Sequence, residues 1–338
     1  MYEQNVRQAV GTLRPGASMS DGPLCILSLR STAKVAARYV LLEQAISRGT
    51  LTITEVSDAG SVPYLQAVNQ GPWPVLIFDG EELVGAKQNR IANATILVSV
   101  GKSVLPVSCV EQGRWSHRSS AFSSGTYASH PSLRRDKERQ VTERSRERAA
   151  AFAAEAASAG SSEEAQYMRS RRFTSDQGRV WDEVGRSSRS LGSDSPTMAM
   201  ADAYETGKSD LEKTMQAFEL DASSTPDDIV GTMVFLGGQF VCMDLLQPAK
   251  RFLHLYPKLL RGYALEALLR KAPVAEDFDP EASALRLFAE ILEAHVDEQA
   301  AADLGYDLRL ETKRVSGSGL VWEQELIQLS MFPKVIAQ

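Results

Sequence analysis

Apolar residues in the first third of the chain recur mainly at strand spacing. Residues 35–47 are the exception, because their apolar positions have helical spacing and Gly49 follows as a stop. The pattern therefore predicts a sheet with one helix. The predicted strands are residues 23–29, 51–56, 75–78, 91–100 and 104–110, the last two joined by a hairpin turn at Gly101-Lys102.

The middle of the chain changes to serine, arginine, glutamate and alanine. Residues 116–132 lack any period and predict a long loop, whereas residues 133–157 predict a helix with a narrow apolar stripe. Capping-box spacing and proline after a capping residue predict further helix starts. These lie at Ser161 with Glu164, Thr174 with Gln177, Ser209 with Glu212, Ser195-Pro196, Thr225-Pro226 and Asp279-Pro280.

The last third returns to mixed elements. Residues 231–246 are apolar around Gly237-Gly238 and predict a buried strand pair or a bulged strand. The remaining pattern predicts helices at 248–256 and 258–271 broken by Pro257, a helix at 280–302, and strands at 307–315 and 320–329 joined by residues 316–319.

These elements predict an α+β fold, in which mixed or antiparallel sheet regions from the N- and C-terminal thirds accompany a helical middle segment. We expect an N-terminal α+β part at residues 1–115, a helical region at 116–225 with its loop at 116–132, and a C-terminal α+β part at 226–338. The first and last parts are expected to pack as one globular unit.

Composition is that of an ordinary globular protein, with 43% hydrophobic and 24% charged residues among 338. No apolar run approaches the roughly 20 residues needed to span a bilayer, and the first residues do not resemble a signal peptide. The three cysteines are an odd number and form no CxxC pair, which argues against a disulfide framework and a thiolate zinc site. We therefore expect a cytoplasmic protein without a membrane partner.

Charge is distributed unevenly around a net value of −6. Residues 114–190 carry 15 basic and 10 acidic side chains, whereas residues 191–338 carry 13 basic and 24 acidic ones. A basic middle can attract an anionic ligand, but the interspersed acids favour a solvated helix of mixed charge. The net negative charge disfavours a nucleic-acid partner.

The first chemistry-bearing segment, residues 79–90, places carboxylates, amides and cations between two apolar strands. In a functional interpretation a carboxylate acts as general base or metal ligand, the cations clamp an anion, and the amides read a base or sugar edge. The alternative is a polar hairpin whose charges form local ion pairs. The residues concerned are Glu81 or Glu82, Lys87 and Arg90, and Gln88 and Asn89.

The second segment, residues 106–117, ends a predicted strand with five reactive or stacking side chains. Glu111 shares a strand face with Cys109 and would raise the pKa of its thiol, so Cys109 is expected to pack rather than to act as a nucleophile. Glu111 with Arg114 predicts either a structural ion pair or a substrate-orienting pair. Trp115 can stack on a ligand ring or pack in the protein, and the role of His117 stays open.

The two segments together resemble the ARG and rhodanese-phosphatase-superfamily-associated protein domain, a prokaryotic family of unassigned chemistry. The resemblance implies a role in nucleotide or ADP-ribose metabolism or in host–virus conflict. Gln328 departs from it, since a histidine is expected there. The resemblance is carried by Glu82-x-x-Gly85-x-x-Gln88-Asn89-Arg90 with Asn93, by residues 106–111 and 113–115, and more weakly by the regions of Trp181, Gly237-Gly238 to Asp244, and residues 319–332.

Residues and resemblance together favour a hydrolase of glycosidic or phosphoester bonds that acts on a nucleotide or ADP-ribose-type ligand in a prokaryotic defence or nucleotide-metabolism system. The alternative is a non-catalytic nucleotide-sensing or partner-binding module of such a system. Cofactor, metal and oligomeric state stay open, a homo-oligomer included, as does any role of Asp244. The predicted catalytic residues are Glu82 and Glu111, and the predicted ligand-binding residues are Lys87, Gln88, Asn89, Arg90, Arg114 and Trp115.

Overall fold

The computed structural model describes residues 2–57, 60–220 and 226–334, which form two compact units. The first unit comprises Met1–Ala37, Lys208–Gln299 and Tyr306–Gln338, and the second comprises Arg38–Gly207 and Ala300–Gly305. Both combine helices with sheets of mainly antiparallel strands, which confirms the predicted α+β class. The units are assembled from non-consecutive stretches of chain.

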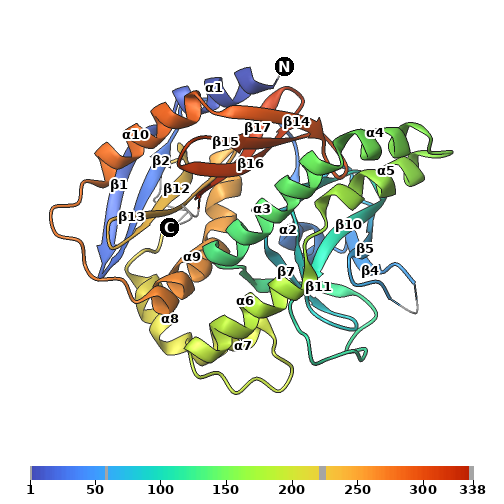
Figure 1. Cartoon of the computed structure of the whole chain (residues 1–338), viewed down its shortest axis with the longest axis horizontal. Coiled ribbons are helices and arrows are strands. Elements are labelled where there is room, and N and C mark those ends of the chain that lie inside the picture. Colours follow the sequence, from blue (N-terminus) through green and yellow to red (C-terminus); the bar gives the residue numbers. More distant parts are fainter. Residues whose placement is uncertain (1, 58–59, 221–225, 335–338) are drawn as a thin grey trace. The chain divides into compact units, whose positions relative to one another are not determined.

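The first unit is built on an eight-stranded antiparallel sheet of order β1-β2-β12-β13-β17-β16-β15-β14 (Figure 1). Its strands are β1 (Arg14–Asp21), β2 (Leu24–Arg30), β12 (Ile229–Leu236), β13 (Gln239–Leu246), β14 (His295–Ala300), β15 (Tyr306–Glu311), β16 (Val315–Trp322) and β17 (Glu325–Pro333). Its helices are α1 (Glu3–Gly11), α8 (Lys208–Gln216), α9 (Ala249–Arg270) and α10 (Pro280–Leu292).

Helices cover both faces of this sheet. Helices α1 and α10 lie side by side, and their apolar residues share one core with Met233 and Phe235 of β12 (Figure 1). Because side chains alternate along a strand, Thr232 points to the opposite face, where its hydroxyl lies 3.3 Å from that of Tyr263 on α9. The strand β12 is therefore buried along its whole length.

The second unit contains a six-stranded sheet of order β11-β7-β8-β10-β5-β4 and a three-stranded sheet of order β3-β6-β9, in which β3 and β6 are parallel. Its strands are β3 (Val40–Leu41), β4 (Leu51–Glu55), β5 (Tyr64–Asn69), β6 (Val75–Ile77), β7 (Glu81–Gly85), β8 (Arg90–Ala92), β9 (Ile96–Val98), β10 (Gly101–Cys109) and β11 (Phe122–Ala128). Its helices are α2 (Leu42–Ser47), α3 (Pro131–Glu147), α4 (Ala149–Ala157), α5 (Ser162–Ser170), the short 3-10 helix η1 (Arg171–Phe173), α6 (Gln177–Ser190) and α7 (Met200–Thr206).

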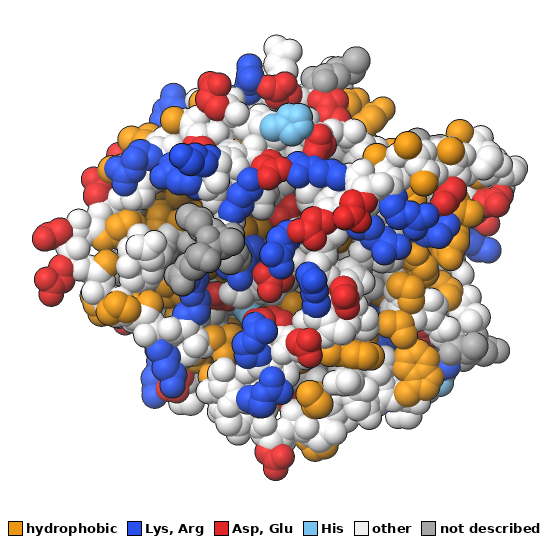
Figure 2. All heavy atoms as spheres, viewed as in Figure 1, with side chains coloured by type: hydrophobic (Ala, Val, Ile, Leu, Met, Phe, Trp, Pro, Cys, Tyr) orange, Lys and Arg blue, Asp and Glu red, His pale blue; other side chains and the backbone are white. Residues whose placement is uncertain are grey.

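Helix α3 is fixed to the second unit by buried charges as well as by its apolar stripe. Lys137 and Arg134 are fully buried and contact Asp79 at 2.6 Å and 3.3 Å. Elsewhere over the helical part of this unit, acidic and basic side chains are interspersed, as Figure 2 shows. The prediction of a solvated helix of mixed charge therefore needs correction for one face of α3, where Val141 also joins the core.

Several element predictions in the second unit are wrong. The strand expected at 91–100 is divided into β8 and β9, which belong to different sheets, and Gly101-Lys102 begins β10 rather than forming a hairpin turn. The helix expected at 133–157 is divided at Arg148 into α3 and α4. Residues 116–132, expected as one loop, contain β11, because polar residues that show no sequence period pair with the neighbouring strand β7. The helix expected at 35–47 is only the short α2, and residues 31–39 have no regular structure. The backbone N–H groups of Ala36 and Ala37 donate instead to the carboxylate of Glu325.

The last third shows a further three errors of element length. Helix α9 runs through Pro257, because burial of its residues on both sides of the proline outweighs the lost backbone hydrogen bond. The helix expected at 280–302 ends at Leu292 and is followed by β14, whereas residues 316–319 lie inside β16 rather than in a turn.

The cap predictions have mixed outcomes. Ser161 caps α5 through a 3.1 Å bond to the N–H of Glu164, and Asp279 caps α10, as predicted. The cap of α6 is Asp176 rather than Thr174, because its carboxylate reaches two backbone N–H groups. The remaining predicted starts do not coincide with observed ones, or lie outside the described residues: Ser195 and Ser209 precede no helix start, and Thr225 is not described.

Candidate functional site

The two polar segments become neighbours through strand pairing in the six-stranded sheet. Strand β8 pairs with β7 on one side and with β10 on the other, which places Arg90 opposite both Leu83 and Cys109. The turn between β7 and β8 begins at Gly85, whose φ of +138° favours glycine. A Cβ atom there would lie 2.8 Å from the carbonyl oxygen of Ala121, so glycine also permits a close backbone contact.

Asn89 links the two predicted catalytic carboxylates. Its side-chain amide donates to Glu82 Oε1 over 3.2 Å, and its backbone N–H donates to Glu111 Oε2 over 3.1 Å. Its amide oxygen accepts a hydrogen bond of 3.2 Å from Arg114 Nη2. All four residues are buried, so Asn89 sits at the centre of one network that joins both sequence segments.

Glu111 and Arg114 form the buried ion pair of this network. Arg114 Nη2 donates to Glu111 Oε2 over 2.6 Å, while Nη1 donates to the carbonyls of Ala86 and Ser116. Burial by itself raises the pKa of Glu111, but hydrogen bonds from Arg114 and Asn89 outweigh it, so that the pKa lies below its ordinary value. Glu111 is therefore an ionised carboxylate, as the predicted pair with Arg114 requires.

Gln88 connects Arg90 to Cys109. Its side-chain oxygen accepts hydrogen bonds from Arg90 Nη1 over 3.1 Å and from Cys109 Sγ over 3.0 Å. Burial raises the pKa of Cys109 despite the opposing effect of the Arg90 charge. The side chain is completely buried, which agrees with the expectation that Cys109 packs as a neutral thiol.

Trp115 gives the site its exposed surface. Its side chain is 50% exposed, with Lys87 Nζ 5.3 Å and the Arg90 guanidinium carbon 5.8 Å from the indole ring. A cation near an aromatic face is attracted to it. The predicted stacking residue is thus half exposed to solvent and lies near two positive charges.

Glu55 is a buried carboxylate next to these residues, and no pattern in the sequence indicates it. It ends β4, at the opposite edge of the sheet from β11, yet its Oε1 lies 3.9 Å from Arg90 Nη2. Strands β4 and β11 also contact each other, so the two edges of the sheet approach. Only this tertiary contact brings Glu55 to residues that lie more than 30 positions later in the sequence.

Other candidates take different places. Glu81 accepts a hydrogen bond of 2.8 Å from the N–H of Phe78 and so stabilises the turn before β7. His117 is exposed. Asp244 and Gln328 lie in the first unit, where both bond to the hydroxyl of Ser330, over 2.6 Å and 2.8 Å. Gln328 thus supports a buried polar cluster around Asp244.

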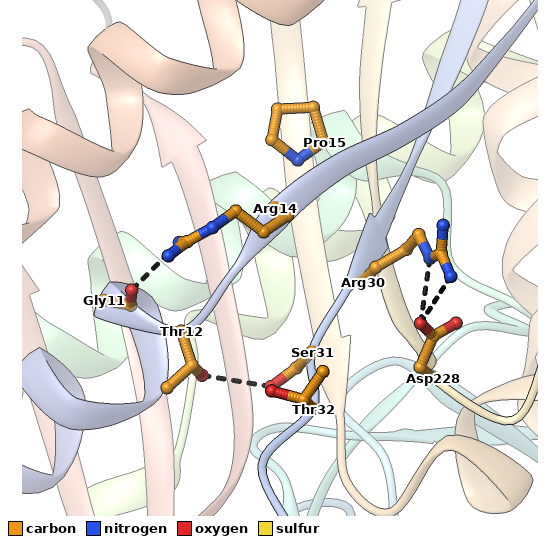
Figure 3. Close-up of a pocket in the computed structure, with 8 residues that line it drawn as sticks. All are labelled: Gly11, Thr12, Arg14, Pro15, Arg30, Ser31, Thr32 and Asp228. Carbon is orange, nitrogen blue, oxygen red and sulfur yellow. Dashed lines mark hydrogen bonds and ion pairs between the residues drawn. The ribbon is translucent and has the colours of Figure 1, made fainter.

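A pocket of about 380 Å³ in the first unit is lined by polar residues whose hydrogen bonds are largely made within the protein (Figure 3). Arg30 Nε donates to Asp228 over 2.9 Å, and the hydroxyls of Thr12 and Ser31 lie 3.0 Å apart. Most of these groups are thus bonded to one another, and the buried Oδ1 of Asp228 is the exception, with no hydrogen bond to the described residues.

Within the described ranges, no cluster of three or more histidine, cysteine, aspartate or glutamate side chains is arranged to bind a metal ion. In the same part of the chain, no helix combines the length and the apolar character needed to cross a membrane.

Fold and site together define an α+β protein in which a buried carboxylate–amide–arginine network lies beside an exposed indole. The chain belongs to the family described as the ARG and Rhodanese-Phosphatase-superfamily-associated Protein domain, which it matches over residues 12–332. The resemblance inferred from the two motifs is thereby confirmed. Searches of curated proteins and of solved structures give no match.

Proposed function

We propose that this chain binds a nucleotide- or ADP-ribose-type ligand at the site formed by Lys87, Arg90 and Trp115. The observation that carries the proposal is a half-exposed indole beside two cations, one of which is completely buried. An aromatic face suits stacking with a base, and lysine and arginine suit the accompanying phosphates. The family name records an association with ARG and with the rhodanese-phosphatase superfamily. This association agrees with the role in prokaryotic nucleotide metabolism or defence that the motif resemblance implies.

In this proposal the buried network positions the ligand-binding residues. Asn89, Glu82, Glu111 and Arg114 are bonded mainly to one another, and they hold the turn that carries Lys87 and the start of β8. Carboxylates that are buried and hydrogen-bonded are poor general bases unless the network opens. We therefore propose ligand recognition without turnover, as in a nucleotide-sensing module, as the first candidate function.

Hydrolysis is the second candidate, supported by one specific observation on Glu111. Its Oε1, which is not the oxygen that bonds Arg114, lies 3.8 Å from the exposed Arg118. An ionised oxygen there could accept a proton from water, with Glu82 as the second carboxylate of the pair. Product formation from ADP-ribose or ADP that is lost in Glu111→Gln would establish this activity.

Binding is tested by titration calorimetry of the full chain with ADP and ADP-ribose. Replacing Trp115 by alanine is expected to weaken binding roughly five- to hundredfold, because one base-stacking contact is lost. Trp73→Ala is the matched control, since Trp73 is also exposed (42%) and has a cation, Arg38, 5.6 Å from its ring. Equal effects of the two substitutions, or no binding by the unmodified chain, would refute the proposed site.

A further inference from the structure

Glu55 and Arg90 are two buried charges that face each other without satisfying each other. Arg90 is completely buried, and the side chain of Glu55 is 6% exposed, yet the closest approach of their charged groups is 3.9 Å. Within the residues that the structure describes, Arg90 Nε, Arg90 Nη2 and both carboxylate oxygens of Glu55 make no hydrogen bond. Two donors and two acceptors are therefore directed into one small region.

This arrangement is unusual because buried charged groups are normally hydrogen-bonded, and leaving them unmatched destabilises a protein. The same unit contains a direct comparison in Glu111 and Arg114, which are also buried but lie 2.6 Å apart. The Glu55–Arg90 pair is wider, and several of its polar atoms make no hydrogen bond. Both features are expected where a further polar group binds between two charges.

The chemistry of the pair restricts that group. A phosphate only accepts hydrogen bonds and would be repelled by Glu55, whereas an amino group only donates and would not use Arg90. A hydroxyl does both, and two adjacent hydroxyls can donate to the two carboxylate oxygens while accepting from the guanidinium. An acidic side chain that accepts from ribose hydroxyls is also the arrangement used in dinucleotide-binding folds.

The position of the pair relative to Trp115 agrees with a nucleoside. Gly60 lies over both: a Cβ atom on it would be 3.5 Å from Glu55 Oε2, 3.4 Å from Trp115 Cζ2 and 3.2 Å from Lys87 Cδ. The indole, the Lys87 side chain and the carboxylate thus all lie close to Gly60, so they are near enough to one another for different parts of one nucleotide to contact them.

We propose that Glu55 and Arg90 recognise the vicinal hydroxyls of a ribose, so that the ligand of this site carries a free 2′,3′-diol. The inference rests on the proposed function. In it the base stacks on Trp115, a phosphate lies near Lys87, and the ribose contacts Glu55 and Arg90. It predicts that the site distinguishes ribonucleotides from 2′-deoxyribonucleotides.

The test compares ADP with 2′-deoxy-ADP by titration calorimetry of the full chain. The unmodified protein is expected to bind ADP roughly ten- to hundredfold more tightly, which corresponds to one hydrogen bond to a charged group. Glu55→Gln should remove most of this ratio by weakening the binding of ADP alone. Glu163→Gln, an exposed residue in the first turn of α5, is the control and should leave both affinities unchanged.

The outcomes separate the two proposals. Equal affinity of the unmodified protein for both nucleotides would overturn the ribose assignment while leaving the binding site intact. Equal weakening of both by Glu55→Gln would mean that the pair is a structural one bridged by buried water. Binding of neither nucleotide would overturn the proposed function and this inference with it. If Glu55→Gln does not fold, the ratio of the affinities for ADP and 2′-deoxy-ADP is compared between the unmodified protein and Glu55→Asp. A ratio near one in the unmodified protein would again overturn the ribose assignment.

Discussion

Replacing Glu111 by glutamine would remove one charge from the buried pair at the centre of the candidate site. Arg114 would keep its bonds to the carbonyls of Ala86 and Ser116, but its positive charge would have no anion at 2.6 Å. Breaking a buried pair at one partner costs about 3–5 kcal/mol, because the remaining charge is uncompensated. Glutamine retains one acceptor oxygen, so we expect a loss near the lower value, about 3 kcal/mol.

Urea unfolding followed by tryptophan fluorescence measures this loss, since Trp73, Trp115 and Trp181 lie in the second unit. Hydrogen exchange at the Asn89 backbone amide gives a local measure, because that N–H donates to Glu111. The matched control is Glu3→Gln. Glu3 and Arg7 are also 2.6 Å apart but exposed, so no measurable loss of stability is expected.

A double-mutant cycle with Arg114→Met separates the pair from the rest of the network. The double variant should be less destabilised than the sum of the single variants, by about 2 kcal/mol or more. Additive losses would refute the reasoning, because they would show that Glu111 and Arg114 contribute independently.

The same pair predicts a pH dependence. The pKa of Glu111 is lower in the folded state than its ordinary value, so its contribution to stability is complete above the pKa of the unfolded chain, about 4.3. That contribution is lost as the pH falls through the folded-state pKa. The stability difference between the unmodified protein and Glu111→Gln should therefore shrink below about pH 4. A difference that stays constant from pH 7 to pH 3 would contradict the assignment.

Two further predictions concern the surroundings of the network. Gly125→Ala should destabilise the protein by about 1–3 kcal/mol in urea titration, because the new Cβ would lie 2.7 Å from Glu82 Oε2. Gly11→Ala is the control, since a Cβ atom there would have no neighbour within 4 Å. Cys109 should not react with an aromatic disulfide reagent in the folded protein, because its thiol is buried and burial raises its pKa, but it should react in urea. Rapid labelling of Cys109 in the folded protein at pH 7, located by mass spectrometry, would disprove this.

The location of the candidate network could be predicted from the sequence because it depends on neighbouring strands. Asn89, Arg90 and Glu111 lie on or beside two apolar strands, and polar residues between such strands stand out against the pattern. Antiparallel pairing of β8 with β10 then brings them together, with Arg90 opposite Cys109. Which of these residues contact each other depends on that register, which the pattern does not specify.

Glu55 shows what the sequence could not reveal. It ends an alternating strand, where a glutamate is an ordinary exposed residue, and no motif surrounds it. Its proximity to Arg90 depends on the approach of β4 to β11 across the sheet, and β11 was itself expected to be loop. The sequence error at 116–132 and the missed carboxylate therefore have the same origin in long-range pairing.

The helix errors have the same physical basis in tertiary contacts that override local signals. Pro257 breaks a helix in an isolated chain, but α9 packs both halves against the sheet of the first unit and continues. Residues 35–37 have helical spacing, but the backbone N–H groups of Ala36 and Ala37 bond to the distant Glu325 and no helix forms there. Local spacing thus predicted where apolar residues lie more reliably than it predicted where a helix begins or ends.

Asn89 connects the buried carboxylates to Arg90, which lies next to the exposed indole of Trp115. Its hydrogen bonds to Glu82 of β7, to Glu111 just after β10 and to Arg114 fix the backbone of the residue directly before Arg90. Arg90 in turn has one guanidinium nitrogen bonded to Gln88 and two without a hydrogen bond inside the described chain. A side chain that is immobilised on one side and unmatched on the other is prepared for a ligand at little entropic cost. Damage to the network should therefore weaken binding through Arg90, even where the altered residue does not contact the ligand.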